Sequence, residues 1–185
     1  MEQFSFEETS MNGLMLIHPF IHYDERGFFM KTYEQHLFEE HGIFLGNAED
    51  LASSSQKGVL RGLHFQTRHA QDKLIRIVRG EVFDVAVDLR KDSKTYGKWE
   101  GFRLSEDNHL GLYIPSGFAH GFLALSENVL FTYRCGQPYE PGYDGGIRYD
   151  DPEIGVKWPL ELVDHLILSE KDQKLPYLRE VNVRL

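Results

Sequence analysis

Short stretches of alternating apolar and polar residues, separated by Gly and Pro, constrain the fold of this chain most strongly. The clearest is FDVAVDL at 83–89, in which apolar side chains occupy every second position. Similar short runs lie at 74–78, 110–115, 121–125 and 129–135. A period of two is typical of β-strands, and several short strands bounded by turn residues predict an antiparallel sandwich or barrel. The 185 residues contain no internal repeat or linker, so we expect one domain over residues 1–185.

One short helix is predicted before these strands. Thr32 and Gln35 have the spacing of a capping box at a helix N-terminus. Leu37 and Phe38 supply an apolar face, and Gly42 can end the helix in a left-handed conformation.

Charge and composition exclude several classes of function. A formal net charge of −9 argues against a nucleic-acid surface, which needs a basic face. No apolar run approaches the length that crosses a bilayer, so we expect no membrane partner. The N-terminal MEQFSFEETS has no basic leader followed by an apolar stretch, and the single Cys135 cannot form an internal disulfide. These features predict a cytoplasmic protein, with Cys135 as a small buried hydrophobe.

The residues around His64 are similar to the metal-binding pattern of the cupin superfamily of β-barrels. In that pattern a glycine and five residues precede His-x-His, and a later glutamate stands seven residues before a second glycine. Here Gly58 leads to His64, but Gln66 replaces the second histidine, and Lys73 stands seven residues before Gly80. An ammonium has no lone pair and repels a divalent cation. The sequence therefore predicts no metal and indicates that Lys73 replaces the positive charge of the metal.

The second half of the cupin pattern, Pro-x-Gly-x-x-His, is complete at Pro115, Gly117 and His120. The role of His120 stays open at this point. It can form a wall of the site, donate a hydrogen bond to substrate, or be a relic of the metal site.

A fixed cation in an apolar barrel can stabilise an oxyanion that develops on a substrate carbonyl. His64 is the natural base for removing the adjacent proton. Tyr133 shares one strand face with Val129, Phe131 and Cys135, so it should point inward with a partner for its hydroxyl, and it can return a proton. Proton abstraction next to a carbonyl, followed by reprotonation on the opposite face, is epimerisation.

Four segments together resemble the dTDP-4-dehydrorhamnose 3,5-epimerase family: GVLRGLHFQ, KLIRIVRGEVFDVAVDLRKDS, IPSGFAHGF and DDPEIGVKWP. The similarity runs from DERGFF at Asp24 to LSEKD at Leu168. It implies an all-β, cupin-like jelly roll with a few short helices, a homodimer, no cofactor, and a nucleotide-sugar substrate, a dTDP-4-keto-6-deoxyhexose epimerised at C3 and C5 in dTDP-L-rhamnose biosynthesis.

The resemblance also implies catalytic roles. His64 corresponds to the base, and Asp172 of LSEKD to the residue that orients and polarises it. Lys73 corresponds to the cation at the enolate oxygen, and Tyr133 to the acid on the opposite face.

Further positions resemble the nucleotide and phosphate contacts of the family. Arg26 and Arg61 match its diphosphate-binding arginines, Phe28 lies in the same contact region, and Tyr139 matches an aromatic side chain that packs on the base. An acidic protein that binds a diphosphate needs such a local cluster of cations.

Arg61 and His64 have opposite parity along a regular strand, so a regular strand cannot place both in one cavity. Gly62 between them predicts a glycine bulge that turns both side chains to the same face.

Some positions depart from the family. Lys31 stands where a glutamate is typical, and residues 49–53, including Glu49 and Leu51, replace a segment like Gln-Asp-Asn-His-Ser. These departures leave open a single-site epimerase that acts on another nucleotide-linked 4-keto sugar. Two other classes remain as alternatives: a metal-dependent cupin enzyme, and a sugar-binding module without catalysis.

Overall fold

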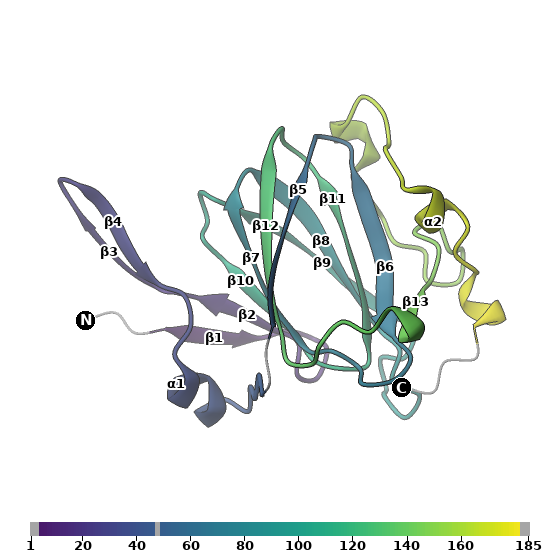
Figure 1. Ribbon diagram of the computed structural model, residues 1–185, viewed down its shortest axis with the longest axis horizontal. Coiled ribbons are helices and arrows are strands. Elements are labelled where there is room, and N and C mark those ends of the chain that lie inside the picture. The colour runs from purple at the N-terminus through teal and green to yellow at the C-terminus, as the bar shows by residue number, and fades with distance from the viewer. Residues whose placement is uncertain (1–3, 47–48, 182–185) are drawn as a thin grey trace.

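The computed structural model describes residues 4–46 and 49–181, and two antiparallel sheets that face each other form its body (Figure 1). The larger sheet has the order β1-β2-β10-β7-β12-β5, with β1 (Ser5–Glu8), β2 (Met15–His18), β10 (Gly111–Ile114), β7 (Lys73–Arg79), β12 (Val129–Cys135) and β5 (Glu49–Ser55). The smaller sheet has the order β13-β6-β11-β8-β9, with β13 (Asp144–Gly146), β6 (Leu60–Gln66), β11 (Phe118–Ala124), β8 (Glu81–Asp88) and β9 (Trp99–Ser105). This arrangement confirms the predicted all-β, cupin-like jelly-roll class.

A separate hairpin of β3 (Phe20–Asp24) and β4 (Gly27–Lys31) projects from the body (Figure 1). The helical elements are short: α1 (Gln35–Glu40), α2 (Glu170–Gln173), and the 3₁₀ turns η1 (Pro141–Tyr143), η2 (Leu160–Leu162) and η3 (Leu178–Glu180). Within the described residues, no helix is long and apolar enough to span a membrane.

The main core lies between the two sheets. Ile75 of β7 and Phe131 of β12 meet Ala86 of β8 and Phe122 of β11, and the Phe122 and Phe131 rings stack with centroids 4.4 Å apart. Tyr133 packs against the same cluster, as the alternation along β12 predicts.

A second core covers the outer face of the smaller sheet. Val85 and Val87 of β8 pack there against Ile154 and Trp158 from the chain that follows β13. Strand β8 is therefore buried on both faces, because one face meets the larger sheet and the other meets the C-terminal segment.

The helix prediction was right about the apolar face and the end, and wrong about the cap. Phe38 is fully buried, and Gly42 has φ +77°. The helix begins at Gln35, however, and the N-cap is Glu34, whose side chain makes no capping hydrogen bond. Thr32 does not cap because it directly follows β4, and the extended Glu34 is the residue that precedes the first turn of the helix.

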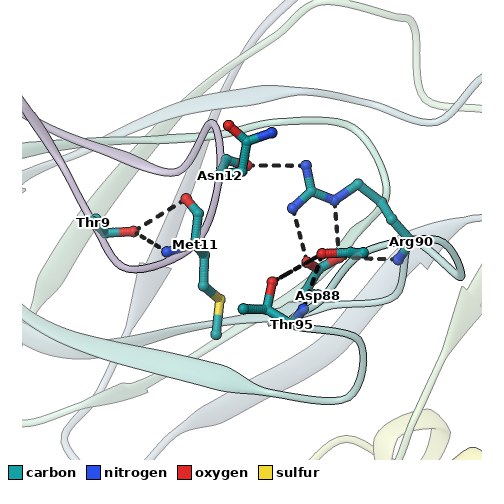
Figure 2. A network of polar contacts seen from close by, with 7 residues as sticks. Thr9, Met11, Asn12, Asp88, Arg90 and Thr95 are labelled. Carbon is teal, nitrogen blue, oxygen red and sulfur yellow. Dashed lines mark hydrogen bonds and ion pairs between the residues drawn. The ribbon is translucent and has the colours of Figure 1, made fainter.

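A buried carboxylate at the end of β8 joins distant parts of the fold (Figure 2). Asp88 is inaccessible to solvent and accepts hydrogen bonds from the Arg90 guanidinium at 2.8 and 2.9 Å and from the Ser93 and Thr95 hydroxyls at 2.6 Å each. Arg90 also donates to the Asn12 carbonyl, which lies in the turn between β1 and β2. Burial by itself raises the pKa of Asp88, but these hydrogen bonds hold it at about 2.

Replacing Asp88 by asparagine should lower the free energy of unfolding by about 3 kcal/mol at neutral pH, because Arg90 loses its buried partner. The folded-state pKa of Asp88 is depressed, so its stabilisation is complete above pH 4 and is lost as the pH falls toward about 2. Urea unfolding at pH 7 and pH 3 tests this: Asp88→Asn should lose less stability on acidification than the wild type. Equal losses in the two proteins would contradict it.

Candidate active site

A bulge in β6 determines which of its side chains reach the space between the sheets. His64 pairs with His120 of β11 and Arg61 pairs with Phe122, so two residues of β6 oppose the single Gly121. Gly62 lies in the bulge with φ +125°. A Cβ on Gly62 would lie 2.5 Å from the Gly121 Cα, so no other residue fits there.

The bulge has the consequence expected from the sequence. Leu60, Leu63 and Phe65 all pack into the outer core, which leaves Arg61 and His64 together on the other face. The Arg61 guanidinium donates to Ser55 Oγ and to the Ser54 carbonyl, both at 3.2 Å.

His64 is held by a carboxylate that lies 108 residues away in the sequence. His64 Nε2 and Asp172 Oδ1 are 2.7 Å apart. Asp172 belongs to α2, and the Ser169 hydroxyl caps this helix by accepting from the Asp172 amide at 3.0 Å. Burial raises the pKa of Asp172, but His64, the Gly62 amide and Ser169 together hold it below its usual value.

The ionised carboxylate can only accept, so His64 Nε2 carries the hydrogen, and in the neutral imidazole Nδ1 has the lone pair. The side chain of His64 is 31% accessible, so a bound molecule can reach the imidazole.

His64, Lys73 and Tyr133 line one cavity of about 240 Å³. His64 comes from the smaller sheet, whereas Lys73 (β7) and Tyr133 (β12) come from the larger one. A planar molecule in this cavity would thus have the histidine on one side and the tyrosine and lysine on the other.

The two side chains from the larger sheet have perturbed acidities. Burial raises the pKa of Tyr133 to about 12, although the hydrogen bond to Ser53 Oγ at 2.9 Å and the charge of Arg61 oppose the change. Burial lowers the pKa of Lys73, and electrostatic interactions with Cys135, Asp84 and Asp144 oppose that change. The sequence predicts a hydrogen-bonding partner for the inward Tyr133 hydroxyl, and the structure identifies it as the Ser53 hydroxyl.

Phe65, Gln71, Asp144 and Lys171 line the cavity without having been singled out by the sequence. Leu51, Gln66 and Cys135, which the sequence singled out for other reasons, line it as well. Lys171 pairs with Asp144 and is the residue before Asp172, so LSEKD supplies two side chains to the site. Gln66, at the position of the second cupin histidine, accepts from the Glu140 amide at 2.6 Å and donates to two backbone carbonyls. Its amide therefore holds the loop that carries Tyr139.

The remaining predicted binding residues lie in three places. Tyr139 lines the cavity, and its hydroxyl donates to Asp144 at 2.8 Å. His120 is almost fully buried and bonds to Asp84. Arg26 and Phe28 lie on the β3–β4 hairpin, which extends away from the sheets, so the single chain does not bring them to the cavity (Figure 1).

Comparison with known proteins decides the family. Residues 8–180 match the family model described as dTDP-4-dehydrorhamnose 3,5-epimerase. The chain belongs to this family. The family and enzyme class that the sequence predicts, a carbohydrate epimerase, are thereby confirmed.

Relatives in the dTDP-4-dehydrorhamnose 3,5-epimerase family match nearly the whole chain. The epimerase of Methanothermobacter thermautotrophicus is 53% identical over all of both chains, and that of Salmonella typhimurium is 46% identical over 92% of this chain and 93% of its own. A Legionella pneumophila dTDP-6-deoxy-D-glucose-3,5-epimerase, solved in complex with dTDP-4-keto-L-rhamnose, superposes with a TM-score of 0.93 at 42% identity, covering 97% of this chain and 95% of its own.

A more distant neighbour acts differently. A 3'-monoepimerase of Streptomyces bikiniensis, in complex with dTDP-quinovose, has a TM-score of 0.87 at 29% identity and covers 94% of this chain and 87% of its own. The fold therefore serves epimerases of one centre as well as of two.

Gly62→Ala should lower the free energy of unfolding by about 2 to 5 kcal/mol, the sum of left-handed strain and steric overlap with β11. Gly27→Ala is a matched control, because Gly27 has φ +120° but no atom lies within 4 Å of the place that a Cβ would take. Gly27→Ala should lower the free energy of unfolding by less, because it adds left-handed strain without steric overlap. Urea unfolding of both variants tests this, and equal losses would contradict the role of close packing at the bulge.

Proposed function

We propose that this epimerase inverts C3 and C5 of dTDP-4-dehydro-6-deoxy-D-glucose by removing and returning protons next to the C4 ketone. The observation that carries the proposal is the position of a carboxylate-held histidine and a protonated tyrosine on facing sheets of one cavity, with a lysine beside them. Each group supplies one step of an epimerisation.

The first step uses His64 as the base. Its Nδ1 takes the proton from C3 or C5, and the electron pair of the broken C–H bond moves into the C4 carbonyl, which becomes an enolate. Asp172 keeps the imidazole in the required tautomer and stabilises the imidazolium that forms. The Lys73 ammonium stabilises the enolate oxygen, where negative charge develops.

The second step uses Tyr133 as the acid. Its hydroxyl gives a proton to the same carbon from the opposite face, and the configuration inverts. The raised pKa of Tyr133, about 12, keeps this hydroxyl protonated at neutral pH. Exchange with solvent then returns the imidazolium and the phenolate to their starting states.

We assign the nucleotide contacts to the residues predicted from the family. Arg61, which shares the face of His64, binds the diphosphate, and Tyr139 at the cavity wall packs on the base. His120 stays a predicted substrate contact.

One observation favours the single-site alternative. Leu51 lines the cavity opposite Tyr133 in the β5–β12 pairing, and it is one of the positions at which the chain departs from the family. A different side chain in the cavity wall next to Tyr133 can change which substrate carbon lies against the Tyr133 hydroxyl. Glu49, whose carboxylate accepts from the Tyr139 amide at 2.7 Å, is a second such position.

We further propose that the epimerase is a homodimer of single cupin-like domains in the cytoplasm. Tyr23, Phe28 and Phe29 are exposed on the projecting hairpin, and apolar patches of this kind mark protein interfaces. The hairpin points away from its own cavity, so Arg26 and Phe28 can serve only the cavity of a second copy. The buried Cys135, the only cysteine, suits a reducing compartment.

Incubation with dTDP-4-dehydro-6-deoxy-D-glucose in deuterated water should remove the proton NMR signals of H3 and H5. His64→Ala should reduce both exchange rates by about a hundredfold or more, because general base catalysis contributes that much. The control His36→Ala, an exposed histidine of α1, should exchange like the wild type.

Each alternative has its own result. Exchange at one carbon alone would establish the single-site epimerase. Absence of exchange in the wild type would refute the proposed function, and undiminished exchange in His64→Ala would refute the role of His64.

Replacing Phe28 and Phe29 together by serine should convert the dimer to a species with the 21.5 kDa mass of one chain, because the hairpin loses its apolar surface. Light scattering after gel filtration measures the mass. Phe44→Ser, a similarly exposed phenylalanine outside the hairpin, should leave the dimer intact. A wild-type protein with the mass of one chain would contradict the dimer.

A further inference from the structure

Helix α2 carries Asp172 and is only four residues long, Glu170–Gln173. A helix of this length does not hold its shape in water by itself, so its position depends on contacts with the rest of the fold. Ser169 caps its N-terminal end. A shift of the other end would carry Asp172 Oδ1 away from His64 Nε2, which lies 2.7 Å from it.

Arg148 holds the C-terminal end of α2. Its Nη1 donates to the carbonyl of Gln173 at 2.8 Å. Gln173 is the last residue of α2 and the neighbour of Asp172. The carbonyls in the last turn of a helix have no partner inside the helix. The guanidinium therefore supplies this hydrogen bond from a different segment of the chain.

The Arg148 side chain is itself fixed in direction. Its Nε and Nη2 donate to the two carboxylate oxygens of Asp150, both at 2.8 Å, and two parallel bonds of this kind set the plane of a guanidinium. The guanidinium also lies over the Tyr177 ring, 5.2 Å from its centroid. The backbone amide of Arg148 donates to the Pro176 carbonyl at 3.0 Å. These contacts join Arg148 to the chain that follows α2 as well as to α2 itself.

The segment that carries Arg148 is in register with His64. Strand β13 pairs with β6, and Gly146 is opposite His64. Leu63 and Ile147 exchange two backbone hydrogen bonds, at 3.0 and 2.9 Å, and Arg148 follows Ile147 directly. Hydrogen bonds thus lead from the strand of the histidine, through Arg148, to the helix of the carboxylate.

We propose that Arg148 is a positioning residue of the epimerase: by fixing the end of α2 to the segment beside His64, it keeps the Asp172 carboxylate at the imidazole. The inference rests on the proposed function. Arg148 lies outside the set of residues that line the cavity, and it acts through Asp172. A catalytic group has to be held within about 0.5 Å of its working position, and a four-residue helix provides this only when both of its ends are fixed.

Arg148→Met keeps the length of the side chain and removes its hydrogen bonds. The exchange rate at saturating substrate, followed by proton NMR at H3 and H5 in deuterated water, should fall about tenfold, because small misplacements of a catalytic group have effects of this order. KM should change by less than about twofold, since the residues that bind the substrate stay in place. Arg148→Lys, which keeps one donor group, should lose less activity.

A double-mutant cycle with Asp172→Ala separates positioning from a general effect on the fold. Once the carboxylate is gone, Arg148→Met has nothing left to position, so its additional effect on the exchange rate should be less than about twofold. A loss of the same size with and without the carboxylate would overturn the inference.

Arg179→Met is the matched control. Arg179 also lies over the Tyr177 ring, 5.6 Å from its centroid, but within the described residues it forms no hydrogen bond with α2. This variant should exchange like the wild type. A folded Arg148→Met protein with the wild-type rate would overturn the inference, as would failure of both Arg148 variants to fold. Absence of exchange in the wild type would instead refute the proposed function.

Discussion

The close approach of β6 and β11 at Gly62 is the constraint on which the site depends. The Gly121 backbone lies where a side chain on Gly62 would be, so β6 can carry an extra residue only with glycine at that point. The bulge restores a common face for Arg61 and His64 and keeps Leu60 and Leu63 in the outer core. The Gly62 amide also points at Asp172 Oδ2, at 3.4 Å, so the same irregularity helps to position the carboxylate that holds His64.

The jelly roll places the proposed base and the proposed acid on different sheets. His64 and its carboxylate belong to the smaller sheet and the segment that covers it, whereas Lys73 and Tyr133 belong to the larger sheet. In the proposed mechanism, a substrate held between the sheets meets a proton acceptor on one face and a proton donor on the other. Inversion therefore follows from the architecture, and neither group has to move across the cavity. The acidic chain concentrates Lys73, Lys171 and Arg61 near this space, where an anionic substrate and an enolate need cations.

The sequence predicted the fold class well, because it depends on local patterns. Alternation identified the strands and the inward face of Tyr133, and the spacing around Gly62 predicted the bulge. Asp172 required the family resemblance, since a contact across 108 residues leaves no periodic signal. The cap at Thr32 was wrong because the helix begins three residues later, at Gln35, after the extended Glu34. Asp144 and Gln71 were missed because loops and a short edge strand bring them to the cavity.

Asp84 and Asp88, four positions apart on β8, show how environment shifts the pKa of one residue type in opposite directions. Asp88 receives hydrogen bonds from Arg90, Ser93 and Thr95, which stabilise its charge and hold its pKa at about 2. Asp84 has His120 as its hydrogen-bonding partner, and burial raises its pKa. The charge of the Asp88 carboxylate is balanced by its own hydrogen-bonding partners, and this network stabilises the fold. A single imidazole does not compensate for the water that burial removes from Asp84, so burial favours the neutral form at this position and the hydrogen bonds favour the charged form at Asp88.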